Sequence, residues 1–299
     1  MPIDADVAVV GGSYAGLSAA LQVARARRRV LIIDAGQRRN RTSAALHGFL
    51  GHDGQPPERI IGVARDQLLK YETVQWIDGC ATRVEGDCES GFTLDVGTRR
   101  WTASRLIVAT GVVDELPAID GLSERWGRSV FHCPYCHGYE LRSGAIGVLA
   151  EGASAVHQTQ LLPDWGEVTL FTRGTFVPDD AQARALKERR VVVEPQPVRR
   201  ICDTATVELT DGRRLPMAGL FATSKTRLAG PLVEQLGLAC EDGSLGAYIR
   251  TDATKATSRE GVYACGDAAH AMGSIALAVA DGAQAGIFAH QSLVFTARV

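Results

Sequence analysis

The first part of the chain alternates short apolar runs with one helical pattern. Residues 7–10 and 30–33 are apolar runs of strand length, and residues 17–26 carry apolar side chains at helical spacing. A glycine-rich turn, residues 11–16, separates the first run from the helix, and Asp34 ends the second run. The order of strand, glycine turn, helix, strand and acid predicts a βαβ unit of the dinucleotide-binding type.

A similar pattern recurs in the middle of the chain. Residues 146–149 predict a strand, residues 150–153 a turn and residues 154–162 a helix. Residues 168–171 predict the next strand of the same unit. The chain is therefore predicted to contain two dinucleotide-fold units.

Three further apolar runs predict strands. They lie outside the βαβ motif with which each unit begins. Residues 106–111 form a buried-type strand that ends in glycine, and residues 220–223 repeat this pattern in the second unit. Residues 261–267 form a late strand that stops at Gly-Asp, and an apolar helix is predicted to follow over residues 274–290.

The order of these elements predicts a first domain that is interrupted by the second. We place the crossings at residues 115–121, which contain a proline, and at residues 242–246, which contain two glycines, because both stretches have the composition of linkers. The predicted domains are residues 1–116 with 244–299, and residues 117–243. The predicted fold class is α/β, with two Rossmann-like dinucleotide-binding domains, the second inserted into the first.

Composition narrows the class of protein. A chain of 299 residues suggests two domains at ~100–200 residues each. Its 45% hydrophobic and 22% charged residues are ordinary for a globular protein, and the net charge of -2 favours neither nucleic acid nor an anionic membrane as a partner. No run reaches the ~18 apolar residues of a membrane span, and no basic segment precedes the first apolar run as in a signal peptide. We therefore expect a cytoplasmic protein.

Cysteine usage indicates redox chemistry at one place. The chain has seven cysteines, an odd number, and only Cys133 and Cys136 form a CxxC pair. This spacing brings two sulfurs within disulfide reach, and exchange proceeds when a thiolate attacks a disulfide sulfur. His137 follows directly, and histidine is a proton shuttle near neutral pH. We predict Cys133, Cys136 and His137 as catalytic residues, with His137 accepting a substrate thiol proton or stabilising a thiolate.

The CxxC-His motif also occurs in two other kinds of site. It matches the attachment pattern of c-type haem, but that modification normally requires export. A zinc site requires four ligands, commonly from two CxxC-like pairs, and no second pair exists because Cys80 and Cys88 are eight residues apart. The sequence therefore predicts no metal site.

The first glycine turn has the chemistry of a phosphate site. Gly11 permits a tight turn, Gly16 permits close packing of helix and strand, and the helix N-terminus offers N–H groups to a pyrophosphate. Ser13 replaces the middle glycine of the usual motif. Asp34 is placed to bond ribose hydroxyls, and Asp267 to bond a polyol such as the ribityl chain of a flavin.

Taken in order, several motifs resemble those of the low-molecular-weight thioredoxin reductases over nearly the whole chain. They are residues 11–16, Asp34, residues 109–111, residues 133–136 and residues 265–267. The resemblance implies FAD as cofactor, an interrupted FAD domain, a nicotinamide-type domain that carries the CxxC, and a homodimer. It also implies that the second cysteine of the CxxC lies against the flavin and that the first meets the substrate.

The residues predicted to bind FAD lie in the glycine turn, at the ends of three strands and at the start of the last helix. They are Gly11, Ser13, Tyr14, Ala15, Gly16, Asp34, Ala109, Thr110, Gly111, Gly266, Asp267, Ser274 and Ile275.

The chain departs from the thioredoxin reductases in two ways. His137 stands where they usually carry an aspartate, and residues 133–140 look like the dithiol oxidases of the gliotoxin and holomycin pathways, which close a disulfide in a small natural product and pass electrons through FAD to oxygen. The second glycine turn keeps only Gly152, and Glu151 places a carboxylate where a pyrophosphate would lie, at a cost of ~1–4 kcal/mol for like charges ~4 Å apart. Of the basic residues expected to hold the 2′-phosphate of NADPH, Arg173 alone matches, so NADPH binding is doubtful.

The leading hypothesis is an FAD-dependent thiol-disulfide oxidoreductase that oxidises a small-molecule dithiol to a disulfide with O2 as acceptor. The alternative is an NADPH-dependent thioredoxin-disulfide reductase, which would act on a disulfide and have a thioredoxin-like partner. A non-catalytic flavin or redox sensor is a third hypothesis. The sequence does not identify the substrate. It predicts that residues 37–57 form a long exposed loop that carries recognition.

Overall fold

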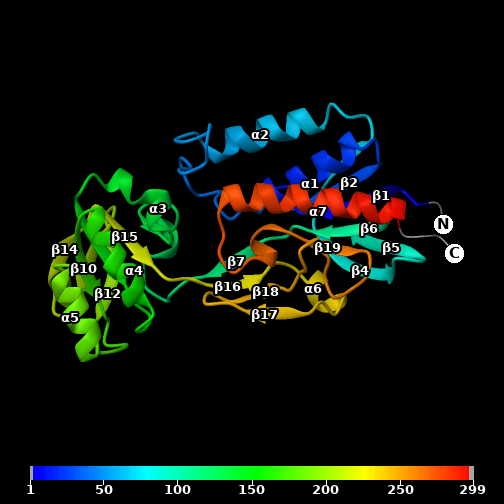
Figure 1. Ribbon diagram of the computed structural model, residues 1–299. Coiled ribbons are helices and arrows are strands. Elements are labelled where there is room, and N and C mark those ends of the chain that lie inside the picture. Colours follow the sequence, from blue (N-terminus) through cyan, green and yellow to red (C-terminus); the bar gives the residue numbers. More distant parts are fainter. Residues whose placement is uncertain (1–2, 296–299) are drawn as a thin grey trace. The chain divides into compact units, whose positions relative to one another are not determined.

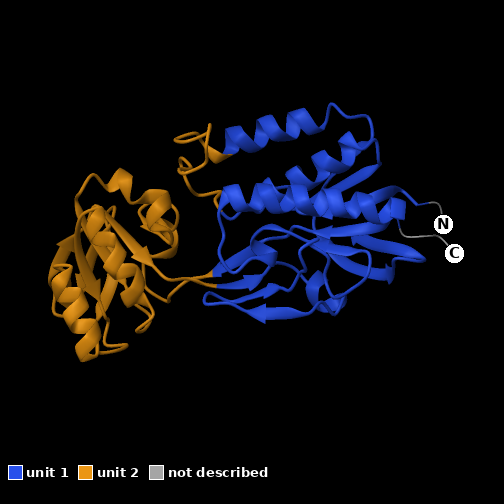
Figure 2. Ribbon diagram, in the orientation of Figure 1, with its two compact units in different colours: residues 1–39, 58–114, 226–299 blue, residues 40–57, 115–225 orange. Residues whose placement is uncertain are grey.

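The chain folds into two compact units, described in the computed structural model over residues 3–295 (Figures 1 and 2). Unit 1 comprises residues 1–39, 58–114 and 226–299, and unit 2 comprises residues 40–57 and 115–225. Both units are built on parallel sheets with helices, which confirms the predicted α/β class. Among the described residues, no helix has both the length and the apolar character needed to cross a membrane.

Unit 1 contains most of the strands and the three longest helices. The elements, in chain order, are β1 (Ala5–Val10), α1 (Tyr14–Arg25), β2 (Val30–Asp34), α2 (Pro57–Leu68), β3 (Val74–Asp78), β4 (Ala81–Asp87), β5 (Gly91–Val96), β6 (Arg99–Val108), β7 (Val112–Glu115), β16 (Lys225–Leu228), α6 (Leu232–Gln235), β17 (Cys240–Asp242), β18 (Ala247–Ile249), β19 (Val262–Ala264), the 3₁₀ turn η4 (Gly266–Ala269) and α7 (Ile275–Phe295).

The main sheet of unit 1 has the order β3-β2-β1-β6-β5-β4, with β19 also paired to β6. β6 is long enough to pair with three strands. Its first half pairs antiparallel with β5, and its second half lies between β1 and β19, both parallel to it. The carboxyl ends of β1, β2, β6 and β19 therefore meet at one edge of the sheet. In open α/β sheets this edge is where ligands bind.

β1 shows why these strands are continuous apolar runs rather than alternating ones. Val7 and Val9 are buried beneath the helices on one face of the sheet, whereas Ala8 and Val10 are buried in a second core cluster on the other face. A strand covered on both sides carries apolar side chains at every position.

On the first of these faces, α1 and α7 run side by side (Figure 1). Two glycines of α7, one helical turn apart, allow this approach. A Cβ atom at Gly282 would lie 2.0 Å from the carbonyl oxygen of Ala15, and one at Gly286 would lie 2.3 Å from that of Ala19. Neither glycine is predictable from the sequence, because a glycine inside an apolar helix has no distinctive local pattern.

Unit 2 has a smaller parallel sheet, in the order β11-β10-β9-β15-β8, and an antiparallel sheet of three strands, in the order β12-β13-β14. Its elements are η1 (Ser123–Arg125), β8 (Val130–Phe131), α3 (Pro134–His137), η2 (Tyr139–Leu141), β9 (Ala145–Leu149), α4 (Ala155–Leu161), η3 (Leu162–Asp164), β10 (Glu167–Phe171), α5 (Asp180–Glu188), β11 (Val192–Glu194), β12 (Val198–Cys202), β13 (Thr206–Leu209), β14 (Arg214–Pro216) and β15 (Gly219–Ala222).

The limits of the compact units differ from the predicted domain boundaries in two segments. Residues 40–57 belong to unit 2 rather than to the first domain, and residues 226–243 belong to unit 1 rather than to the second. The second difference has a clear physical cause: Leu232 is buried in the core of unit 1, and the side chain of Gln235 accepts a 2.8 Å hydrogen bond from the Val84 N–H of β4. α6 thus covers a sheet that is distant from it in sequence.

Candidate functional site

The glycine turn between β1 and α1 is fixed by close backbone contacts. Gly11 has φ +110, and a Cβ atom there would lie 2.2 Å from the carbonyl oxygen of Ala109 at the end of β6. A Cβ atom at Gly16 would lie 1.7 Å from the carbonyl oxygen of Gly11. Only glycine fits either position, so the turn keeps its backbone tight and directs the N-terminus of α1 out of the sheet edge.

Asp34 ends β2 beside this turn, as predicted. Its carboxylate accepts a 3.0 Å hydrogen bond from the N–H of Gly12. Gly12 is also enclosed by Trp76 of β3, since a Cβ atom there would lie 2.4 Å from the indole ring. Asp34 therefore holds the turn in shape in addition to the ribose role that the sequence predicts. Trp76 was not predicted, because it lies in the next strand of the sheet and outside the glycine motif.

Later segments of the chain complete this edge of unit 1. Gly266, with φ +70, lies against the first turn of α1, where an added Cβ would be 2.8 Å from that of Ala15. At the end of β6, the hydroxyl of Thr110 is buried and has no hydrogen-bond partner among the described residues. Ser274 caps α7, because its side chain accepts a 3.1 Å hydrogen bond from the N–H of Leu277. The glycine turn, the ends of β2 and β6 and the turn at Gly266 thus meet at the start of α1.

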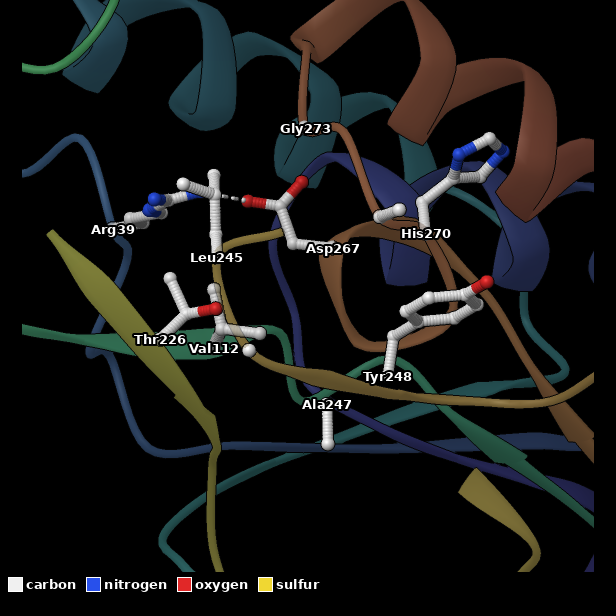
Figure 3. Close-up of a pocket in the computed structure, with 11 residues that line it drawn as sticks. Arg39, Val112, Thr226, Leu245, Ala247, Tyr248, Asp267, His270 and Gly273 are labelled. Atoms are coloured by element: carbon white, nitrogen blue, oxygen red, sulfur yellow. Dashed lines mark hydrogen bonds and ion pairs between the residues drawn. The ribbon is translucent and has the colours of Figure 1, made fainter. Parts of the chain in front are cut away.

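Asp267 forms part of an ion-pair cluster with Arg39 and Asp114. Arg39 binds both carboxylate oxygens of Asp114, at 2.7 and 2.9 Å. It also binds one oxygen of Asp267 at 2.9 Å (Figure 3). Burial by itself lowers the pKa of Arg39, but the two carboxylates outweigh it and raise the pKa above its ordinary value. Arg39 therefore stays charged and holds Asp267 in position. Asp114 had no signal in the sequence, because a single acid after a strand is common.

A small pocket opens beside this cluster. Arg39 and Asp267 line it together with Tyr248 of β18, His270 and the backbone of Gly273 (Figure 3). All of its lining residues belong to unit 1. The pocket therefore offers both charged and hydroxyl groups to a ligand held there.

A buried ion pair between Lys255 and Asp281 holds the backbone of Gly266 in place. Lys255 Nζ lies 2.5 Å from Asp281 Oδ1 of α7, and the other oxygen of Asp281 accepts a 3.3 Å hydrogen bond from the N–H of Gly266. Asp281 is only 5% exposed, so this contact ties α7 to the turn that carries Asp267. Neither Lys255 nor Asp281 was predicted from the sequence.

These residues fit FAD. Gly11 and Gly16 hold the backbone of the turn tightly at the N-terminus of α1. The first N–H groups of that helix have no partner within the helix, and such groups bind a pyrophosphate. The unpartnered Thr110 hydroxyl and the fixed Asp267 carboxylate are further polar groups at the same edge. The donor set has the chemistry of a nucleotide and polyol site. Among the described residues, no cluster of three or more His, Cys, Asp or Glu side chains is arranged to bind a metal ion.

The predicted catalytic residues lie in unit 2, on the short helix α3. Cys133 precedes α3 in extended conformation, with φ -103 and ψ 117, and Pro134 begins the helix. Cys136 and His137 follow in its single turn, and both cysteines are half-buried. This arrangement places Cys133 at the N-cap of α3 and Cys136 within the same single turn.

His137 is stacked on Phe131, with ring centroids 4.2 Å apart and planes inclined by 13°. Burial lowers its pKa, the positive charge of His47 lowers it further, and the backbone carbonyl of Cys133 opposes both, leaving a pKa of about 4. The imidazole is therefore neutral at pH 7 and has a lone pair with which to accept a proton.

Residues 40–57 form a loop that packs within unit 2 around this histidine. Ser43 Oγ lies 3.2 Å from His137 Nε2. His47 Nδ1 lies 3.4 Å from a carboxylate oxygen of Glu140 and 3.6 Å from one of Asp53. The predicted absence of regular structure in this loop is confirmed. Its contribution to the surroundings of the CxxC was not predicted.

The second dinucleotide-type turn has a different chemistry from the first. Glu151 forms an ion pair with Arg173, which follows β10, and Arg173 also points toward the carbonyl of Ala150 at 3.5 Å. The turn thus carries a carboxylate, and the one cation expected to meet a nucleotide phosphate is already paired within the protein. The sequence predicted both residues but not their contact.

Comparisons with known proteins agree with this arrangement. The sequence profile of the pyridine nucleotide-disulphide oxidoreductases matches residues 5–285. Thioredoxin reductase sirT of Leptosphaeria maculans is 31% identical over 303 residues, which cover 94% of this chain and 92% of that protein. The crystal structure of an oxidoreductase from Agrobacterium tumefaciens matches with a TM-score of 0.96 and 51% identity over 99% of this chain and 100% of that chain. The crystal structure of HlmI matches with a TM-score of 0.89 and 35% identity over 97% and 92% of the two chains.

The matched profile spans nearly all of the chain, including both glycine turns and the CxxC. The chain therefore belongs to the pyridine nucleotide-disulphide oxidoreductase family, and it is a thioredoxin reductase-like flavin disulfide oxidoreductase.

Proposed function

We propose that this protein is a dithiol oxidase that uses FAD and O2, and that it does not use NADPH. The single observation that carries this proposal is the Glu151–Arg173 ion pair in the second dinucleotide-type turn. A carboxylate beside a pyrophosphate weakens NADPH binding by ~1–4 kcal/mol. An arginine already paired with that carboxylate contributes little to binding the 2′-phosphate. Electrons must then enter from a thiol substrate.

His137 supports the same direction of electron flow. A substrate dithiol must lose a proton before it attacks a disulfide, because the thiolate is the nucleophile. Burial and His47 lower the pKa of His137 to about 4, so at pH 7 the imidazole is neutral and has a lone pair for that proton. The same low pKa makes it a weak base, so the imidazolium would pass the proton on readily. Burial against Phe131 keeps the ring in one orientation.

The reaction on the protein's own residues balances. One substrate thiolate attacks Cys133 Sγ, which breaks the Cys133–Cys136 disulfide and forms a mixed disulfide with Cys133. The second substrate thiolate then attacks its partner sulfur in the mixed disulfide, so that the substrate leaves as a disulfide. Two electrons and two protons have then moved from the substrate to Cys133 and Cys136. When bound, FAD supplies a two-electron acceptor that oxygen can reoxidise, giving hydrogen peroxide.

The residues proposed to hold FAD are the ones gathered at the sheet edge of unit 1. Gly11, Gly16 and the start of α1 would receive the pyrophosphate, Asp34 the ribose, and Asp267 the ribityl chain. We further propose a cytoplasmic homodimer, as the resemblance to thioredoxin reductases implies, and gel filtration with light scattering tests the oligomeric state.

The deciding experiment is anaerobic. The FAD-loaded protein is mixed with dithiothreitol, and separately with NADPH, and the oxidised flavin band is followed. Bleaching by the dithiol but not by NADPH, followed by peroxide formation on admission of air, is the expected result. Rapid bleaching by NADPH would refute the proposal and support the alternative of an NADPH-dependent thioredoxin-disulfide reductase; the relative sirT is named a thioredoxin reductase.

A further inference from the structure

The loop of residues 40–57 is built to hold Ser43 still. Its ends are tied together, since the N–H of Leu46 donates to the Gln55 carbonyl at 3.0 Å and the N–H of Gly54 donates to the Leu46 carbonyl at 2.9 Å. The side chain of Leu46 is only 5% exposed. Nearby, Gly127 of unit 2 leaves room for Thr42, whose hydroxyl would lie 2.2 Å from a Cβ atom added there. A loop anchored at these points can position a side chain as a regular element does.

The hydrogen bonds of Ser43 define which nitrogen of His137 carries a proton. Ser43 Oγ lies 2.7 Å from the carbonyl oxygen of Ala45, which can only accept, so the single hydroxyl proton is donated there. The Ser43 oxygen can then only accept from His137 Nε2, 3.2 Å away. A neutral imidazole has one N–H, so a proton on Nε2 leaves Nδ1 with its lone pair.

Nδ1 is the ring nitrogen of His137 that this arrangement leaves bare. It is buried and has no hydrogen-bond partner among the described residues. The carbonyl of Cys133 raises the pKa of His137, so the ring lies near the first residue of the CxxC. The charged and titratable groups that surround the ring are His47 of the loop, Glu140 beside it, and the two cysteines of α3.

We propose that Ser43 is a positioning residue that fixes His137 with its proton on Nε2 and presents Nδ1 as the atom that accepts the thiol proton. The inference rests on the proposed dithiol oxidase function for its kinetic consequence, but the tautomer itself does not depend on it. The loop that follows β2 is then part of the thiol site, although it lies 94 residues from His137 in sequence.

The first test reads the tautomer without any substrate. Long-range ¹H–¹⁵N spectra of the FAD-loaded protein with labelled histidine distinguish a protonated from a bare ring nitrogen, and His137→Gln identifies the signals. Protonated Nε2 with bare Nδ1 is expected. Protonated Nδ1 would overturn the proposal even if the protein oxidises dithiols.

The second test is kinetic. Ser43→Ala should slow anaerobic flavin reduction by dithiothreitol by about tenfold, the equivalent of one lost hydrogen bond, whereas Ser43→Thr, which keeps the hydroxyl, should stay within about twofold. Ser154→Ala is the matched control, because Ser154 is an exposed serine of the same unit without a side-chain cap bond. Unchanged rates in Ser43→Ala would refute the role of Ser43.

A charged variant at position 43 tests whether this side chain hydrogen-bonds His137 or only packs near it. In Ser43→Asp the carboxylate would accept from Nε2–H and favour imidazolium, so the pKa of His137 should rise by about one unit or more, measured by NMR titration. Ser154→Asp adds the same charge at an exposed site and should leave it unchanged. An equal shift in both variants, or none in Ser43→Asp, would show that Ser43 does not contact the ring. If the wild type shows no dithiol-dependent bleaching, the proposed function fails while these spectra still decide the tautomer.

Discussion

Gly282→Ala tests the closest helix contact in unit 1. The added Cβ would lie 2.0 Å from the Ala15 carbonyl oxygen and 2.8 Å from its carbonyl carbon, whereas ordinary contact begins at 3.4 Å. α1 and α7 must therefore separate by about 1.4 Å (3.4 minus 2.0) or deform. The neighbouring atoms belong to the backbone of a helix, so neither can be relieved by a rotamer change.

The expected loss of stability follows from two opposing effects. Overpacking costs ~1–3 kcal/mol, with a rigid backbone contact at the high end. Replacing glycine by alanine inside a helix returns up to ~1 kcal/mol. We expect a net destabilisation of ~2 kcal/mol, which corresponds to a melting temperature lower by about 4–8 °C for a domain of this size.

The contact also supports the cofactor edge, since Ala15 lies in the first turn of α1. Gly282→Ala should therefore retain less FAD, measured as the ratio of flavin to protein absorbance after gel filtration. Gly62→Ala is the matched control: Gly62 is an exposed glycine of α2 with no heavy atom near its Cβ position, so alanine should stabilise the protein by ~0.5–1 kcal/mol. Unaltered melting and flavin content in Gly282→Ala would show that α1 and α7 are not in backbone contact.

The remaining predictions concern the chemistry. Cys136→Ser should stay yellow with bound FAD but resist bleaching by dithiothreitol, whereas the exposed Cys240→Ser should behave as wild type; bleaching of Cys136→Ser would contradict the assignment. His137→Ala should slow flavin reduction by ~10²–10⁴-fold, and an unchanged rate would make the residue structural. The folded-state pKa of His137 is about 4, below its ordinary 6.5, so between pH 6.5 and 4 the unfolded chain binds a proton that the folded chain does not. Wild type should therefore lose stability relative to His137→Gln as the pH falls from 6.5 to 4. Parallel pH dependence of the two unfolding free energies would refute this. Glu151→Ala, which frees Arg173, should bind NADPH about tenfold or more tightly, and no change by fluorescence titration would remove the argument against nicotinamide use.

The local elements could be predicted because their causes are local. The apolar runs at residues 7–10 and 30–33 became β1 and β2 within one or two residues, and the glycine turn lies between β1 and α1 as expected. Strands covered on both faces leave an uninterrupted apolar run, and a tight turn requires glycine. The CxxC was equally visible, since its chemistry depends on spacing alone.

The errors and omissions concern contacts between distant segments. The predicted boundary near residues 242–246 followed linker composition, but α6 packs its apolar side chains on β4, so the chain returns to unit 1 earlier. Arg39 lies in the predicted loop of residues 37–57, yet its side chain joins Asp114 and Asp267 from two other parts of the chain. The periodicity of apolar residues carries no information about side-chain contacts between segments far apart in the sequence.

By itself, the sequence determined the two dinucleotide-type units, the redox-active cysteine pair and the departure of the second turn from a nucleotide site. Only the tertiary structure decided that Ser43 reaches His137, that Arg173 is paired with Glu151, and that α7 needs glycine where it crosses α1. The physical reason is that periodicity, turn geometry and short motifs are set by neighbouring residues. The protonation, pairing and packing of a side chain are set by whatever the fold brings against it.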